Sequence, residues 1–220
     1  MKSSEFINEG LNYPIICVDV QPEYAYYGNN AGTCENIIHF VNKQTGPVLM
    51  FVNAEDTGVS GDTVQDIHTY WEQVIGGEPE YDDETGDYAE QESQINWNRF
   101  TVVDKGFGYL RSWMDQGVSP AGIIKTIRMM YQQKVQDSRM LFGGDDTEGY
   151  EESMQQLLGN DWQDWMASDG ISVEWISVAQ LKKFSGAYLV GGGRDECLRE
   201  VEIIMNAFNI RYKRIDSLVY

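Results

Sequence analysis

The sequence has few basic residues and no long apolar run. Its 16 lysines and arginines are outnumbered by 35 aspartates and glutamates, which gives a formal net charge of −19 over 220 residues. Nucleic acids and anionic membranes are bound mainly through lysine and arginine, so this charge argues against both as partners. No apolar stretch approaches the roughly 18 residues that cross a bilayer, so we expect no membrane span.

Cysteine and histidine are too scarce for a structural zinc site. Cys17, Cys34 and Cys197 form no Cys-x-x-Cys pair and no cluster with the two histidines. Residues 1–13 are polar and lack the apolar centre of a signal peptide. We therefore expect free thiols, a reducing compartment and a cytoplasmic location.

Negative charge is concentrated in residues 78–92, which hold eight acidic side chains and no basic one. Such a run is typical of a solvated loop. A cation site is the less favoured interpretation, because the acids do not follow the regular spacing of a calcium-binding loop.

Short apolar runs alternate along the chain with segments of helical spacing. The runs are typical of strands buried on both faces of a parallel sheet, and they lie at residues 14–20, 48–52, 100–103, 187–190 and 210–215. Helical spacing is found at residues 33–43, 63–74, 119–131, 177–184 and 195–208. The alternation predicts an α/β fold with three αβα layers and a central, mostly parallel, Rossmann-like sheet, in a single domain over residues 1–220.

The most informative stretch is the glycine turn at residues 191–193 with Cys197 just beyond it. An apolar run precedes the turn and an amphipathic run follows, so we expect a strand, a turn and a helix with Cys197 in its first turn. The positive end of the helix dipole lowers the pKa of such a thiol and favours the thiolate. The same geometry suits a phosphate, and the glycines could simply permit a tight turn.

Two further candidate residues follow predicted strands. Asp19 ends the first strand and Lys105 follows the third, and functional groups usually lie at the carboxyl ends of such strands. A carboxylate can accept the proton of a thiol, and an ammonium group can stabilise developing negative charge. Asp19, Lys105 and Cys197 are therefore a chemically complete set for nucleophilic catalysis, although acids and lysines near strand ends are common.

The segment Asp-Val-Gln-Pro-Glu-Tyr at residues 19–24 resembles the Asp-x-Gln-x-x-aromatic signature of the isochorismatase-like cysteine hydrolases. That family includes nicotinamidases, isochorismatases and carbamoyl-amide hydrolases, and it carries Asp, Lys and Cys in the same chain order. It also has a glycine six positions before the cysteine and often an acid two before it, matched here by Gly191 and Asp195.

The resemblance implies a role for each member of the set. Asp19 is expected to be the general base, Lys105 to orient or stabilise charged groups, and Cys197 to attack a carbonyl or imine carbon. The attack would form a covalent intermediate. The implied substrate is a small molecule with an amide, imide or related C–N or C–O bond.

The resemblance also implies roles for the turn and for the first motif. Backbone amides near Gly193 and Cys197 would form the oxyanion hole, and a non-proline cis peptide bond would lie at Gly192–Gly193. Gln21 and Tyr24 are the candidate substrate-binding residues. The implied assembly is a homo-oligomer.

Two of the chain's departures from the family bear on the expected site. Lys105 and Cys197 are 92 positions apart, roughly twice the usual separation, which implies a helical insertion at about 119–166. This insertion could be a lid, an oligomerisation arm or a specificity element. Residues 53–56 are Asn-Ala-Glu-Asp, where metal-binding members have Asp-x-His, so we expect no catalytic metal and no cofactor.

The favoured interpretation is a cysteine hydrolase. One alternative is a catalytically inactive member of the same fold that binds a ligand or a partner through the insertion. The other is a phosphate or nucleotide binder that uses the glycine turn, against which the net charge of −19 counts.

Overall fold

A parallel five-stranded sheet forms the centre of the protein. The computed structural model describes residues 12–26, 28–53, 62–77, 81–82, 87–88, 93–104, 117, 119–132 and 178–220. The strand order is β5-β2-β1-β6-β7, and every neighbouring pair is parallel. The strands are β1 (Ile15–Val18), β2 (Val48–Val52), β5 (Phe100–Asp104), β6 (Ala187–Gly191) and β7 (Tyr212–Arg214).

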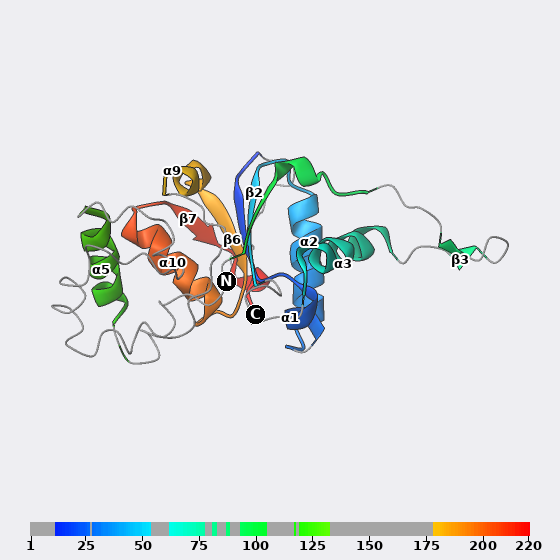
Figure 1. Ribbon diagram of the computed structural model, residues 1–220, viewed down its shortest axis with the longest axis horizontal. Coiled ribbons are helices and arrows are strands. Elements are labelled where there is room, and N and C mark those ends of the chain that lie inside the picture. The colour runs from blue at the N-terminus through cyan, green and yellow to red at the C-terminus, as the bar shows by residue number, and fades with distance from the viewer. Residues whose placement is uncertain are drawn as a thin grey trace, which may run out of the picture.

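Helices cover both faces of this sheet, as Figure 1 shows. One side carries α1 (Pro22–Tyr26), α2 (Ala31–Asn42) and α3 (Val64–Gly76). The other side carries α5 (Pro120–Gln132), α9 (Val178–Leu181) and α10 (Cys197–Ala207). Short 3-10 turns lie at Trp97–Arg99, Lys182–Phe184 and Asp216–Leu218, the last being η4. The predicted three-layer α/β fold is confirmed.

The apolar runs form strands because both of their faces are buried. Successive side chains of a strand point to opposite faces. Ile16 and Val18 therefore belong to the core beneath α10, whereas Ile15 and Cys17 belong to the core beneath α2 and α3. All four are fully buried. A strand placed between two helical layers needs such a continuous apolar run.

The first helix of the region expected to be an insertion belongs to one of these layers. Ile123 of α5 is fully buried in the core that α10 also covers. Arg128 donates from Nε to the Ala207 carbonyl at 2.9 Å and from Nη2 to the Asn206 carbonyl at 3.0 Å. The Asn206 carbonyl also accepts from the Asn209 N–H at 3.3 Å, and the guanidinium adds a partner for these last carbonyls of α10. Residues 133–177, which include the rest of that region, lie outside the described residues.

The acidic segment contains more regular structure than the sequence predicts. β3 (Tyr81–Asp82) and β4 (Asp87–Tyr88) pair antiparallel, with Tyr81 opposite Tyr88. The prediction of a plain loop is wrong for these four residues. Backbone pairing across a four-residue connection is a common hairpin geometry, and the abundance of acids gave no indication of it. The neighbouring residues of the segment are not described.

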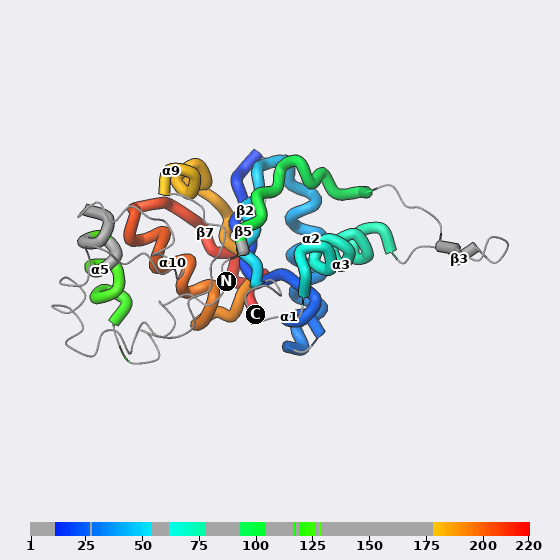
Figure 2. Tube along the Cα trace, viewed as in Figure 1, coloured from blue at the N-terminus to red at the C-terminus, as the bar shows by residue number. Residues whose placement is uncertain are grey.

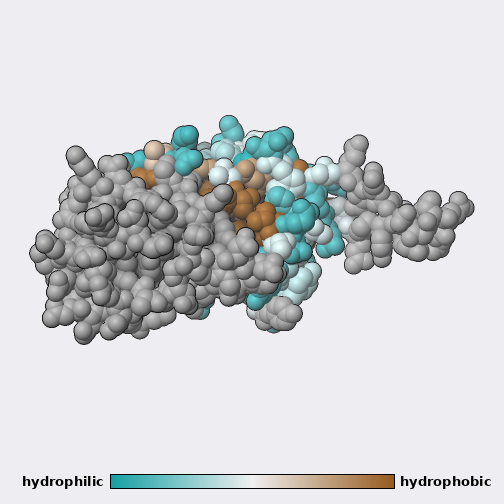
Figure 3. Space-filling view, viewed as in Figure 1, coloured by the Kyte–Doolittle hydropathy of each residue, from teal (hydrophilic) through white to brown (hydrophobic). Residues whose placement is uncertain are grey.

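The described surface that is visible in Figure 3 is partly hydrophobic and partly hydrophilic. Hydrophobic residues gather in the middle of the view in Figure 3, and the surface over α3 beside them is hydrophilic. None of the helices in the described part of the chain is long and apolar enough to cross a membrane.

The strands β1 and β6 leave no space for a side chain between Gly191 and Val18, where both strands end. Gly191 pairs with Val18 and has a φ of +81°. A Cβ at Gly191 would lie 2.3 Å from the Val18 carbonyl oxygen and 2.8 Å from Cγ2 of Val20. Only glycine fits this position without a shift of one strand, because its lack of a Cβ permits both the positive φ and the contact.

The substitution Gly191→Ala should destabilise the protein more than Gly186→Ala. Gly186 also has a positive φ, +92°, but an added Cβ there meets nothing within 4 Å. We expect Gly186→Ala to cost about 1–2 kcal/mol through backbone strain alone. We expect Gly191→Ala to cost about 2 kcal/mol more because of steric overlap. Urea unfolding of both variants measures the difference, and equal losses would contradict the close approach of the strands.

Candidate active site

A cavity of about 490 Å³ lies at the carboxyl ends of β1 and β6. The connection after β1 runs to α2 on one face of the sheet, and the connection after β6 runs to α10 on the other (Figure 1). Such a reversal is where α/β proteins usually bind ligands. The described lining comes from four places along the chain, represented by Asp19, Tyr24, Cys197 and Tyr220.

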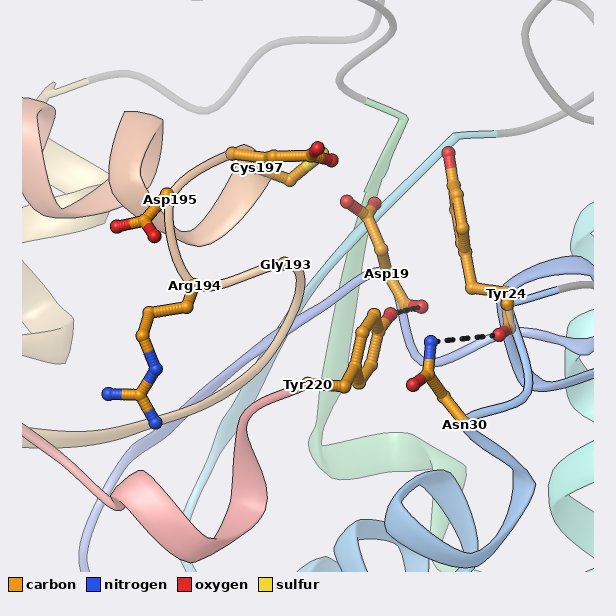
Figure 4. Close-up of a pocket in the computed structure, with 10 residues that line it drawn as sticks. Asp19, Tyr24, Asn30, Gly193, Arg194, Asp195, Cys197 and Tyr220 are labelled. Atoms are coloured by element: carbon orange, nitrogen blue, oxygen red, sulfur yellow. Dashed lines mark hydrogen bonds between the residues drawn. The ribbon is translucent and has the colours of Figure 1, made fainter.

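Asp19 is held in place by its backbone. Its N–H donates to the Phe51 carbonyl at 2.8 Å, and its carbonyl accepts from the Tyr220 hydroxyl at 2.5 Å. Its φ of +52° lies in the left-handed region, which aspartate tolerates better than most residues. The residue is 1% exposed. In Figure 4 its side chain points toward the start of α10, where Cys197 lies.

Cys197 is the first residue of α10 and is 8% exposed. The turn before it closes on itself, because the Gly193 carbonyl accepts from the N–H groups of Glu196 at 3.0 Å and Leu198 at 3.3 Å. The predicted order of strand, glycine turn and helix is confirmed. Cys197 lines the cavity together with Asp19, at a helix start whose dipole favours a thiolate.

The glycine turn differs from the expectation in its peptide geometry. All peptide bonds of the described residues are trans, so the predicted cis bond at Gly192–Gly193 is wrong. Positive φ angles at Gly191 and Gly192, +81° and +64°, reverse the chain instead. Gly193 lines the cavity, and the Gly192 carbonyl accepts from the Tyr220 N–H at 3.3 Å. The role of this turn as an oxyanion hole stays a prediction.

Tyr24 lines the cavity and is fixed at both ends. Its hydroxyl accepts a hydrogen bond from Nδ2 of Asn53 at 2.8 Å, and its carbonyl accepts one from Nδ2 of Asn30 at 3.3 Å. Asn30 also lines the cavity. Tyr24 therefore lies at the cavity, and Asn53 fixes the position of its hydroxyl. Its role in substrate binding stays a prediction.

Gln21 has different surroundings from those expected of a substrate-binding residue. Its Nε2 donates to the Asn53 carbonyl at 2.8 Å and to Oδ2 of Asp62 at 3.1 Å, and its Oε1 accepts from the Asn53 N–H at 3.0 Å. It is fully buried and is not part of the described lining of the cavity. Gln21 therefore fastens the start of α1 to the end of β2.

Lys105 lies outside the described residues. It follows β5, whose last residue is Asp104, and β5 ends at the same edge of the sheet as β1 and β6. The structure thus brings Asp19 and Cys197 to one cavity, and the role of Lys105 beside them stays a prediction.

Acidic residues outnumber basic ones in the described lining of the cavity. The acids are Asp19, Asp195 and Glu196, and the base is Arg194. Nη1 of Arg194 lies 3.0 Å from Oδ1 of Asp216, which holds part of its charge away from a ligand. Hydrogen bonds from Arg214 and Arg194 lower the pKa of the Asp216 carboxyl, so this pairing persists at neutral pH.

Tyr220 and the two asparagines were missed by sequence reasoning. The Tyr220 hydroxyl and the Asp19 carbonyl are 201 positions apart, and no local pattern connects them. Asn30 directly precedes α2 and Asn53 directly follows β2, and these positions next to regular elements were the available signal.

Comparisons with known proteins provide no relative. No protein-family model, curated protein or solved structure matches the chain. Within the described residues, no group of three or more His, Cys, Asp or Glu side chains is arranged to hold a metal ion.

Iodoacetamide should label Cys197 well before Cys17 and Cys34. Both of those thiols are fully buried. Burial raises the pKa of Cys17 well above its usual value, and burial with the nearby Glu35 raises that of Cys34 to about 12. At about pH 8 only about one Cys34 in ten thousand is therefore a thiolate.

Peptide mass spectrometry after timed quenching measures the three rates. We expect Cys197 to react at least about tenfold faster than either other cysteine. The matched control is the protein in concentrated urea, where the three rates should become similar. Earlier labelling of Cys17 or Cys34 in the folded protein would contradict the assignment.

Proposed function

We propose that the chain is a cysteine hydrolase that acts on a small amide or a related C–N or C–O bond. The observation that carries the proposal is the cavity shared by Asp19 and Cys197, which follow the adjacent parallel strands β1 and β6 (Figure 4). A thiol at a helix start with a carboxylate in the same cavity supplies both a nucleophile and a base. The motif order Asp, Lys, Cys supports the same assignment.

The first half of the reaction forms a thioester. The Asp19 carboxylate accepts the thiol proton of Cys197, and the thiolate attacks the carbonyl carbon to form a C–S bond. Backbone N–H groups at the start of α10 stabilise the oxyanion. The tetrahedral intermediate then loses its C–N bond, and the proton on Asp19 passes to the leaving nitrogen. An amine or ammonia departs and the acyl group remains on sulfur.

The second half regenerates the enzyme. Asp19 accepts a proton from water as the water oxygen attacks the thioester carbonyl. The C–S bond breaks, and the thiolate of Cys197 recovers its proton from Asp19. The sum is one amide and one water converted to one acid and one amine. Lys105 would stabilise negative charge in both halves, as the motif order implies.

The phosphate interpretation has less support. The start of α10 carries Asp195 and Glu196, which repel an anion, and the nearby Arg194 is paired with Asp216. The interpretation as a non-catalytic ligand binder requires the same cavity but no covalent step. Turnover therefore separates it from the hydrolase.

Replacing Cys197 or Asp19 should abolish hydrolysis. The assay measures ammonia released from a panel of small primary amides. For the amides that the unaltered protein cleaves, we expect Cys197→Ala and Asp19→Asn to lower kcat/KM by about a thousandfold or more, because each removes a group from the covalent step. Mass spectrometry of the unaltered protein should detect an acyl adduct on Cys197.

Cys34→Ala is the matched control, since it removes a fully buried thiol that is not among the described residues lining the cavity, and its rate should be retained. Undiminished ammonia release by Cys197→Ala would refute the covalent mechanism. Saturable amide binding without any turnover by the unaltered protein would instead favour the non-catalytic ligand binder.

A further inference from the structure

Tyr220 joins the two turns that carry Asp19 and Cys197. Its hydroxyl donates to the Asp19 carbonyl at 2.5 Å, beyond the end of β1. Its N–H donates to the Gly192 carbonyl at 3.3 Å, and its own carbonyl accepts from the Arg194 N–H at 2.9 Å, both in the turn after β6. Figure 4 shows the ring between these segments, below the side chain of Asp19. One residue thus contacts both sides of the cavity.

The position of Tyr220 is set by the segment before it rather than by the cavity. Ile215 is 1% exposed in the core beneath α2, and the Leu218 N–H donates to its carbonyl at 2.9 Å, which closes η4. Asp216 of this turn pairs with Arg194 and with Arg214 of β7. Figure 2 shows the end of the chain beside the start of α10 and near α1. The ring is therefore delivered by an anchored turn.

The Tyr220 hydroxyl stays protonated and remains a donor. Burial raises its pKa well above the usual value, and the nearby Asp19 raises it further. The other ionisable groups that face it are Cys34, Cys197 and Cys17, which act in the same direction. A phenol in this environment cannot compete with Asp19 as a base, so its role is to donate a hydrogen bond.

The bond matters because of the backbone that it holds. Asp19 has a left-handed φ of +52°, its N–H is held by Phe51 and its carbonyl is held by Tyr220. Without the second bond the backbone at Asp19 is less restrained, and the residue can shift its carboxylate relative to Cys197. A displacement of about 1 Å between reacting groups is enough to lower a rate about a hundredfold.

We infer that Tyr220 is a positioning residue, which holds the Asp19 carboxylate in line with the Cys197 thiol through the Asp19 carbonyl. The consequence for catalysis rests on the proposed hydrolase function. The contacts of Tyr220 with both turns are a property of the fold and do not depend on that function.

The substitution Tyr220→Phe tests the inference, because it keeps the ring and removes only the donor. The probe is iodoacetamide, and the readout is the second-order rate of Cys197 alkylation as a function of pH. We expect an approximately tenfold lower rate at neutral pH, because the thiol loses an aligned acceptor for its proton. Tyr212→Phe is the matched control: Tyr212 is a half-buried tyrosine whose hydroxyl accepts from Asn206 and which is not among the described residues that line the cavity.

A double-mutant cycle with Asp19→Asn separates positioning from a general structural effect. If Tyr220 acts through Asp19, Tyr220→Phe should have little further effect on alkylation in the Asp19→Asn background. Tyr212→Phe should leave the rate unchanged in both backgrounds. Thermal unfolding and circular dichroism confirm that each variant is folded before its rate is compared.

The outcomes distinguish this inference from the proposed function. If Cys197 is alkylated at the same rate in Tyr220→Phe as in the unaltered protein, the positioning role is overturned and the hydrolase proposal still stands. Additive effects of Tyr220→Phe and Asp19→Asn also overturn it. A Cys197 that is unreactive in the unaltered protein overturns both.

Discussion

The contact between the ends of β1 and β6 determines where everything else at the cavity lies. Gly191 lies against the Val18 carbonyl with no space for a Cβ. Beyond this contact the chain leaves β1 toward α2 and leaves β6 toward α10, on opposite faces of the sheet. The two turns diverge and leave a cavity between them. A single close approach of two backbones thus brings Asp19 and Cys197 to one space from opposite ends of the chain.

Each side of this cavity has its own support. On the α1 side, Asn53 after β2 contacts both Gln21 and Tyr24. On the α10 side, the segment after β7 contacts the glycine turn through Tyr220 and through the ion pair of Asp216 with Arg194. The supports come from strands on either side of the central pair. A site that is held from two directions resists the rotation of either turn. Nucleophilic catalysis depends on such fixed positions of the reacting groups.

Local pattern was sufficient for the fold and for placing Asp19 and Cys197 at the same edge of the sheet. The strands could be predicted because burial on both faces demands a continuous apolar run, as in residues 15–18. The position of Cys197 followed from the glycines before it. The surroundings of Gln21 could not be predicted, because a motif names a residue and not its hydrogen-bond partners, which here are Asn53 and Asp62. Tyr220 was missed because its contact joins positions that no local period relates.

Charge adds a constraint on what the cavity can accept. Its described lining carries three carboxyl groups, and the guanidinium of Arg194 that accompanies them is shared with Asp216. The whole chain is strongly negative as well. A phosphate or a carboxylate ligand would approach against this field, whereas a neutral amide would not. The charge of the cavity and the chemistry proposed for Cys197 and Asp19 therefore favour the same class of ligand, a small uncharged one.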